Sequence, residues 1–144
     1  MKRWSLLVIL ALCSCAGLGL AAESPLGKWN TIDEKTGKVT SQVELYMEGG
    51  KLFGKIVSLP EPNDSKGNPL ICSECSGADK DKPIIGLVIM KNLVLKGDRY
   101  MDGSLLDPND GMIYRGEVWV EDGKLKVRGF YGIFHGTRTW LRAQ

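Results

Sequence analysis

Three consecutive stretches decide the fold of this chain: KVTSQVELYM over residues 38–47, the turn EGG over 48–50 and KLFGKIVSL over 51–59. In the first run, every second side chain lies on one face of an extended strand, namely Val39, Ser41, Val43, Leu45 and Met47. Alternation with a period of two is typical of a strand that buries one face. Because the turn is short, the second run returns beside the first, and the pair is predicted to form an antiparallel hairpin.

The same pattern of short runs and tight turns continues along the rest of the chain. Strand-like runs cover residues 27–33, 84–90 with 93–95, 99–106, 112–120, 124–131 and 137–142, separated by turns rich in Gly, Asp and Asn. Eight or nine hairpin-linked strands must protect two sheet edges, and pairing the last strand with the first removes both. We therefore predict an all-β domain, a single antiparallel up-and-down barrel of about eight strands with one long loop.

The N-terminus has the pattern of a secretory signal peptide. Lys2 and Arg3 precede an apolar run that continues with small residues to Ala22. We therefore predict a signal peptide over residues 1–22, a barrel domain over residues 23–144, and a periplasmic or secreted location. In an alternative interpretation, the sequence around Cys15 is a lipoprotein box, and lipid on Cys15 tethers the same domain to a membrane.

The charge of the predicted mature domain is balanced. The chain has 19 Lys and Arg against 17 Asp and Glu, and removing Lys2 and Arg3 leaves 17 of each sign. A nucleic-acid partner would require a concentrated excess of Lys and Arg, so none is expected.

Three glycines interrupt predicted strands in phase with apolar residues. Gly54, Gly116 and Gly129 each occupy a position where a side chain would face the interior. Glycine weakens a strand, so two reasons for its presence are considered. The glycines allow the sheet to bend shut, or they leave volume for a ligand, and both reasons can hold together.

The long loop over residues 60–83 contains Cys72 and Cys75, the two cysteines of the predicted mature chain. An oxidising compartment favours a structural disulfide between them. A redox-active pair and a metal site are the alternatives. The redox motif normally opens a helix after a strand, and His135 is the one histidine available to a zinc site, so neither context fits well.

Several motifs in order resemble the bacterial domain-of-unknown-function 2147 family. They are Ser24-Pro25, Gly27-x-Trp29, Gly50-Lys51-Leu52, Gly54-Lys55-Ile56, Cys72-x-x-Cys75, Lys82-Pro83-Ile84, Leu106-Asp107-Pro108, Gly123-Lys124-Leu125 and Thr139-Trp140-x-Arg142. The resemblance spans residues 24–142 and implies an exported protein with a calycin or lipocalin-like barrel. It further implies that Arg142, near the end of the last strand, covers Trp29 and plugs one end of the barrel.

Aromatic residues out of phase with the apolar stripes form a separate group. Phe53, Trp119 and Phe130 are predicted to point away from the interior. Either the long loop covers them, or they form a partner surface or a homodimer contact, because grouped exposed aromatic side chains often mark interfaces.

The leading functional hypothesis is a binding protein that holds a small, largely apolar molecule in its interior. The predicted pocket residues are Val43, Leu45, Ile56, Tyr114, Val118, Val127 and Tyr131. The alternative is a cell-envelope protein–protein interaction module with a filled core. A cavity of roughly 300 Å³ or more favours the first hypothesis. No set of acid, base and nucleophile emerges around His135, so neither an enzyme nor a cofactor is expected.

Overall fold

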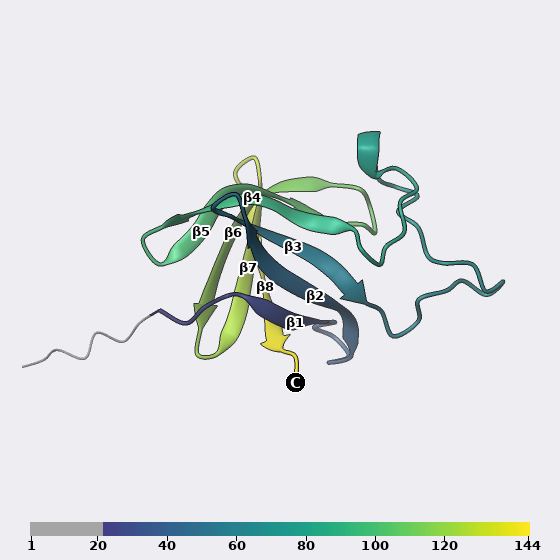
Figure 1. Cartoon of the computed structure of the whole chain (residues 1–144), viewed down its shortest axis with the longest axis horizontal. Helices are drawn as coiled ribbons and strands as arrows, with labels where there is room; N and C mark the ends of the chain where they lie inside the picture. The colour runs from purple at the N-terminus through teal and green to yellow at the C-terminus, as the bar shows by residue number, and fades with distance from the viewer. Residues whose placement is uncertain (1–21) are drawn as a thin grey trace, which may run out of the picture.

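Eight antiparallel strands close into a barrel in the computed structural model, which describes residues 22–144 (Figure 1). Each strand pairs with its neighbours in the chain, and the last pairs with the first, so the predicted fold class is confirmed. Residues 1–21 of the predicted signal peptide, with Cys15, lie outside the described residues. The strands are β1 (Gly27–Ile32), β2 (Val39–Glu48), β3 (Lys51–Ser58), β4 (Val88–Lys96), β5 (Arg99–Leu106), β6 (Ile113–Glu121), β7 (Lys124–Tyr131) and β8 (Phe134–Arg142).

The β2–β3 hairpin has the register that the alternation predicts. Val43 lies opposite Ile56, and Leu45 lies opposite Gly54. The turn residues Gly49 and Gly50 both have positive φ, the conformation that lets a two-residue turn follow the twist of its strands. The hairpin therefore presents Val43, Leu45 and Ile56 to the interior, where all three are buried.

The barrel closes through a short seam between β1 and β8. Trp29 pairs with Arg142 and Asn30 pairs with Leu141, and these are the two register pairs of the seam. The guanidinium carbon of Arg142 lies 3.9 Å from the centre of the Trp29 ring, which is fully buried. Arg142 also donates hydrogen bonds to the Leu26 and Ser24 carbonyl oxygens at 2.7 and 3.0 Å. One guanidinium thus joins β8, the buried indole and the segment before β1.

The central glycines make room for neighbouring side chains. A Cβ atom added to Gly54 would lie within 3.2 Å of Met90 side-chain atoms, and one added to Gly129 would lie 3.2 Å from the Tyr114 Cβ. At Gly116 the added atom would lie 2.7 Å from the Leu105 Cγ. The suggestion that these glycines leave volume for a ligand is therefore wrong, because Met90, Tyr114 and Leu105 already occupy it.

The connection from β3 to β4 extends from one end of the barrel (Figure 1), and those of its residues that belong to the buried core all follow residue 71. A disulfide joins Cys72 to Cys75, and both cysteines belong to the buried core together with Ile84 and Leu87. The Glu74 carbonyl oxygen comes so close to Gly111 that an added Cβ there would lie 2.0 Å from it, and the positive φ of Gly111 also disfavours other residues. The connection includes a short 3₁₀ helix, η1 (Gly77–Asp79).

The boundary of β4 differs from the prediction. Residues 84–87 are apolar, yet they belong to the connection, and β4 begins at Val88. The Ile84 N–H donates to the Leu70 carbonyl within the connection, and the Gly86 N–H donates to the Ile56 carbonyl. Burial against the core, rather than membership of a strand, explains Ile84 and Leu87, whereas Ile85 is exposed. No helix within residues 22–144 has the length and apolar character needed to cross a membrane.

Replacing Gly116 with Ala is expected to destabilise the barrel by about 1–3 kcal/mol, because the new methyl group overlaps the Leu105 side chain. Gly136→Ala is the matched control, since a Cβ atom there meets nothing within 4 Å. Urea unfolding followed by tryptophan fluorescence measures both variants. Equal urea midpoints for the two variants would contradict the close packing of Gly116 against Leu105.

Replacing Arg142 with Met is expected to lower the free energy of unfolding by about 1–3 kcal/mol, since the cation–π contact and two charge-assisted hydrogen bonds disappear. Arg138→Met is the control, because the Arg138–Glu34 ion pair is largely exposed and contributes little. A calorimetric melting temperature that falls equally in both variants would show that Arg142 has no special role.

Candidate functional site

Most of the predicted pocket residues form a packed interior. Val43, Leu45, Ile56, Val118 and Val127 are all at most 6% exposed and belong to one buried cluster. Large side chains from every part of the barrel fill the space among them, including Trp29, Leu52, Met90, Leu93, Leu105, Leu125 and Trp140. These five residues are core residues in this structure, and they line neither of the two hollows on the surface of the barrel.

The two predicted tyrosines lie closer to the surface. Tyr114 is half-buried, and its ring packs edge-on against Tyr131 at 6.2 Å between centroids. Tyr131 itself is 58% exposed, so its placement among interior residues was wrong. The reason is its position at the end of β7, where the β7–β8 hairpin continues past the packed interior.

Two of the three outward aromatics are covered by arginine rather than by the long loop. Trp119 is only 8% exposed, because the guanidinium carbons of Arg99 and Arg128 lie 4.0 and 4.9 Å from its ring centre. Glu117 holds Arg99 through a 2.7 Å ion pair. The prediction that Trp119 is available to a partner is therefore wrong.

Phe130 has a similar arrangement on the outer face of β7. The Arg115 guanidinium carbon lies 4.3 Å from its ring centre, and the His135 ring lies 5.6 Å away. These contacts assign His135 a packing role on the outer surface. Within residues 22–144 no group of three or more His, Cys, Asp and Glu side chains is arranged to hold a metal ion.

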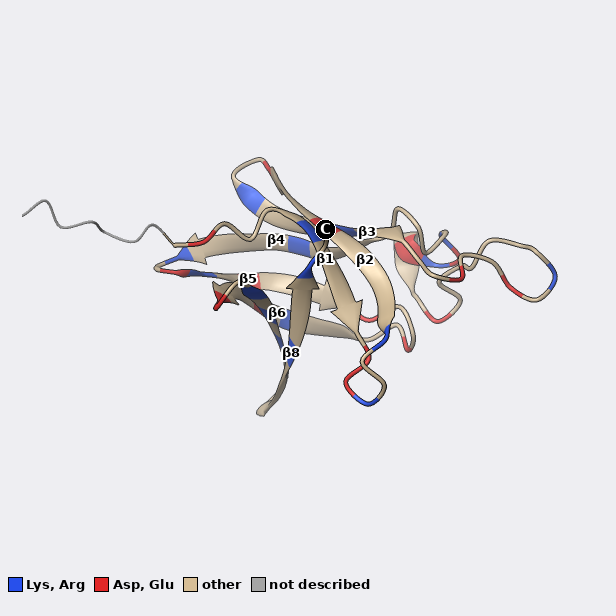
Figure 2. Ribbon diagram, turned by 90° about the horizontal axis from the view of Figure 1, so that it is seen from below, with Lys and Arg blue, Asp and Glu red and all other residues tan. Residues whose placement is uncertain are grey.

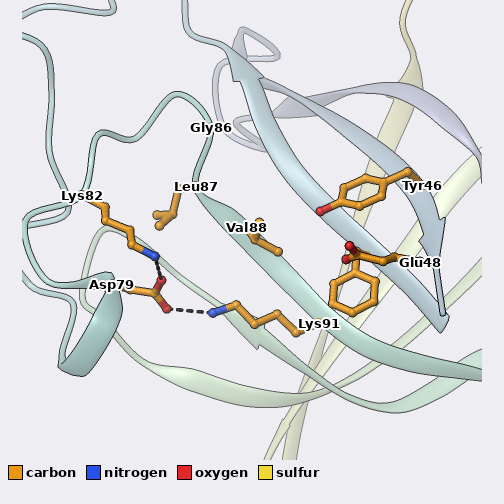
Figure 3. A pocket seen from close by; sticks show the side chains of 9 residues that line it. Tyr46, Glu48, Asp79, Lys82, Gly86, Leu87, Val88 and Lys91 are labelled. Carbon is orange, nitrogen blue, oxygen red and sulfur yellow. Dashed lines mark hydrogen bonds and ion pairs between the residues drawn. The ribbon is translucent and has the colours of Figure 1, made fainter.

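Phe53 has a different environment, a hollow of about 250 Å³ on the outer surface (Figure 3). Strands β2 and β3 supply one wall, since Tyr46 lies opposite Phe53 in the register and their rings stack at 5.9 Å. The end of the long connection and the start of β4 supply the other wall. The lining residues are Tyr46, Glu48, Phe53, Asp79, Lys82, Gly86, Leu87, Val88 and Lys91.

Charged groups of both signs surround this hollow. Asp79 accepts hydrogen bonds from Lys91 at 2.8 Å and from Lys82 at 3.1 Å, as the dashed lines in Figure 3 show. The hydrogen bond from Lys91 is the main cause that holds the pKa of Asp79 below its usual value, and Lys82 adds to it. Asp79 therefore joins η1 to β4 and fixes the position of two ammonium groups at the rim.

Tyr46 contributes an aromatic ring with a polar tip. Partial burial raises the pKa of its hydroxyl, and the nearby Glu48 and Glu44 carboxylates raise it further. The hydroxyl thus stays protonated at neutral pH, where it can donate a hydrogen bond. The Lys55 ammonium lies 5.2 Å from the ring centre and adds a cation–π contact.

Stacked rings, an apolar floor and a few convergent polar groups are the components of a small-molecule site. Phe53 and Tyr46 offer flat surfaces, Leu87 and Val88 are apolar, and Lys82 and Lys91 supply charged donors. Such an arrangement can hold a ring and orient its substituents. The prediction from the sequence included Phe53 and the long loop, but it did not include Tyr46 or Lys91 and did not single out Asp79 within the loop, because no local motif brings these residues together.

A second hollow of about 390 Å³ lies along β4, β5 and β6. Its lining includes Tyr114, Ile113, Ser104 and Gly103, and the ion-paired Asp102. It is shallower and more open than the first, and no pair of stacked rings faces it. Figure 2 shows Lys and Arg interspersed with Asp and Glu over the strands and loops, so charge alone favours neither hollow.

The closed eight-stranded barrel, with an arginine covering a buried tryptophan at one end, has a lipocalin-like fold. The sequence matches the family described as "Uncharacterized protein conserved in bacteria (DUF2147)" over residues 27–142, and the chain belongs to this family. No curated protein matches the chain.

Two solved structures resemble the chain. One is the protein HP1028 from the human pathogen Helicobacter pylori, described as belonging to the lipocalin family, with a TM-score of 0.66 and 21% identity. The alignment covers 83% of this chain and 82% of HP1028. The other is a mutant of the fluorescent protein UnaG, with a TM-score of 0.43, 19% identity and coverage of 83% and 96%. The likeness to HP1028 supports the barrel fold.

The side-chain carboxyl of Asp79 is expected to titrate below its ordinary pKa of 3.8. Because the folded-state pKa is lowered, the ion pairs stabilise the fold above the unfolded-state value and are lost as pH falls through the folded-state value. NMR titration of the carboxyl carbon measures the midpoint, which Lys91→Gln should move back towards 3.8. An unchanged midpoint in that variant would show that Lys91 does not hold Asp79.

Proposed function

We propose that this protein binds a small ring-bearing molecule with polar substituents in the outer hollow between β2–β4 and the long connection. The observation that carries the proposal is the stacked Tyr46–Phe53 pair beside a hollow whose rim holds Asp79, Lys82 and Lys91. A volume of about 250 Å³ suits one ring with short substituents rather than a long acyl chain. The proposed role is binding rather than catalysis.

The packed interior is the reason to place the ligand outside. An eight-stranded barrel has an interior that side chains can fill or that can hold one small ligand. Here Met90, Leu105 and Tyr114 fill the space beside the central glycines. An apolar ligand in the interior would have to displace such side chains, whereas a ligand in the hollow meets surfaces that are already free.

The proposed setting is the periplasm or the exterior of a bacterial cell. The signal-peptide pattern over residues 1–22 supports export, and the Cys72–Cys75 disulfide suits an oxidising compartment. A lipid on Cys15 would instead hold the same barrel at a membrane surface. Intact mass of the membrane fraction distinguishes the two.

Three probes test the proposed site by NMR of the nitrogen-labelled protein. 4-Hydroxybenzoate is an anionic ring, tyramine is a cationic ring, and dodecanoate is an acyl chain that would require an interior cavity. We expect at least one ring probe to shift the amide signals of Tyr46, Phe53 and Val88. Phe53→Ala is expected to weaken that binding about fivefold, a loss of about 1 kcal/mol from one stacked aromatic contact.

Phe130→Ala is the matched control, because Phe130 is an outer-face aromatic on β7 that does not line the hollow. It should leave the affinity for the ring probe unchanged. The proposal fails if neither ring probe shifts the amide signals of the residues that line the hollow. If dodecanoate instead shifts the amide signals of Val43 and Val127, the result would support binding of an apolar ligand in the interior.

A further inference from the structure

Strand β8 has one edge that is mostly unpaired within the described residues. Along its other edge it pairs with β7 from Lys124 opposite Leu141 to Tyr131 opposite Phe134. Along this edge it meets β1 only at Leu141 and Arg142, followed by a hydrogen bond from the Ala143 N–H to the Lys28 carbonyl. The stretch from Phe134 to Thr139 therefore pairs with no strand on the β1 side, where Glu34 of the β1–β2 turn reaches Arg138 through a 3.2 Å ion pair.

The directions of the backbone groups on this edge follow from the seam. Successive residues of a strand point their N–H and C=O groups to opposite sides. Because the Ala143 N–H donates towards β1, the backbone N–H and C=O groups of Thr139, Thr137 and His135 also point to the β1 side. Three N–H and three C=O groups thus face outwards, in the arrangement that another extended strand can bind.

Side chains at this edge are unusually exposed and partly apolar. Residues 134–138 are all exposed, Phe134 is 72% exposed, and Ile133 in the adjacent turn is 90% exposed. Figure 2 shows the β7–β8 hairpin projecting from the barrel. Natural edges are usually blocked by charged side chains, Pro or a bulge, and residues 134–139 contain one charged side chain, Arg138, no Pro and no bulge in their pairing with β7.

We infer that this edge pairs with the same edge of a second copy, giving a twofold-symmetric antiparallel dimer. With the axis at Gly136, His135 and Thr137 of one copy face Thr137 and His135 of the other, so four backbone hydrogen bonds form. Phe134 then lies opposite Arg138 in both halves, which places a cation beside an aromatic ring. Gly136 meets its own counterpart, where a Cβ atom has open space.

The twofold register favours a second copy over a foreign strand, because it places Phe134 opposite Arg138 twice. Arg138 is the one fully charged side chain between Phe134 and Thr139, and the twofold arrangement keeps the two Arg138 groups apart. The barrel domain has equal numbers of positive and negative side chains, so two copies meet without net repulsion. An edge that is complementary to itself satisfies the requirement of a twofold interface.

Thr137→Pro tests the inference. The Thr137 N–H points to the free edge, so proline removes a bond of the dimer without removing a β7–β8 bond. Sedimentation equilibrium of the protein between about 5 and 500 μM should show a rise from monomer to dimer, as expected of a small and weak interface. In the proline variant the dimer dissociation constant should rise at least tenfold.

Thr137→Ala is the matched control. It removes the same hydroxyl, which accepts a hydrogen bond from Arg128, but it keeps the N–H, so it should dimerise like the original protein. A protein that stays monomeric over the whole concentration range overturns the inference. Equal weakening by Ala and Pro also overturns it, because the backbone edge would then not be the contact.

Gly136→Cys provides a second test that does not depend on how proline folds. Two cysteines on the twofold axis lie within disulfide distance of each other, so mild oxidation should give a covalent dimer on a non-reducing gel. Arg138→Cys is the control, because that position faces Phe134 rather than its own copy. Cross-linking at position 138 but not at position 136 would reject the twofold at Gly136 and, with it, the inferred dimer.

Discussion

Closure of the barrel depends on the contact between Trp29 and Arg142. Strands β1 and β8 share two register pairs, so backbone hydrogen bonds alone give this seam little strength. Arg142 compensates, because its guanidinium covers the buried indole and also donates to two carbonyls of the segment before β1. The indole N–H in turn donates to the Pro25 carbonyl at 2.8 Å. Side chains thus hold the seam together, and the interior stays packed because this seam keeps the barrel closed.

A filled interior changes where recognition can occur. The glycines that curve the sheet are matched by Met90, Leu105 and Tyr114, which occupy the space that a ligand would need. The long connection is likewise packed, since its disulfide and Leu87 join the core. What the connection leaves free is its junction with the outer face of β2 and β3. Phe53 and Tyr46 line the same hollow there as the ion-paired Asp79. The candidate site therefore lies on the outer wall of the barrel rather than in its interior.

Alternation alone was sufficient to predict the barrel and the inward face of β2, β3 and β7. It succeeded because burial of one face repeats every second residue, as at Val43, Leu45 and Val127. It placed Trp119 on the outer face but could not show that Arg99 and Arg128 on neighbouring strands bury it there. It also could not find the hollow, because Asp79 and Lys91 belong to segments that only the folded connection brings together. Residues that meet through tertiary packing leave no local period to detect.

The exposed edge of β8 follows from the early end of its pairing with β1, which stops at Asn30 although β1 continues to Ile32. Strand β1 has six residues and β8 has nine, so part of β8 must lack a partner there. Asp33 ends β1, because its carboxylate accepts hydrogen bonds from the Lys35 and Thr36 N–H groups and turns the chain. These two bonds also lower the pKa of Asp33, which keeps the carboxylate ionised as an acceptor. In the register of the seam Ile32 would lie opposite Thr139, so β1 has already left β8 before the turn at Asp33 begins. The departure of β1 from β8 after Asn30, next to the irregularity in its pairing with β2 between Thr31 and Ile32, thus limits the seam to the Trp29 end and leaves the remaining edge of β8 unpaired.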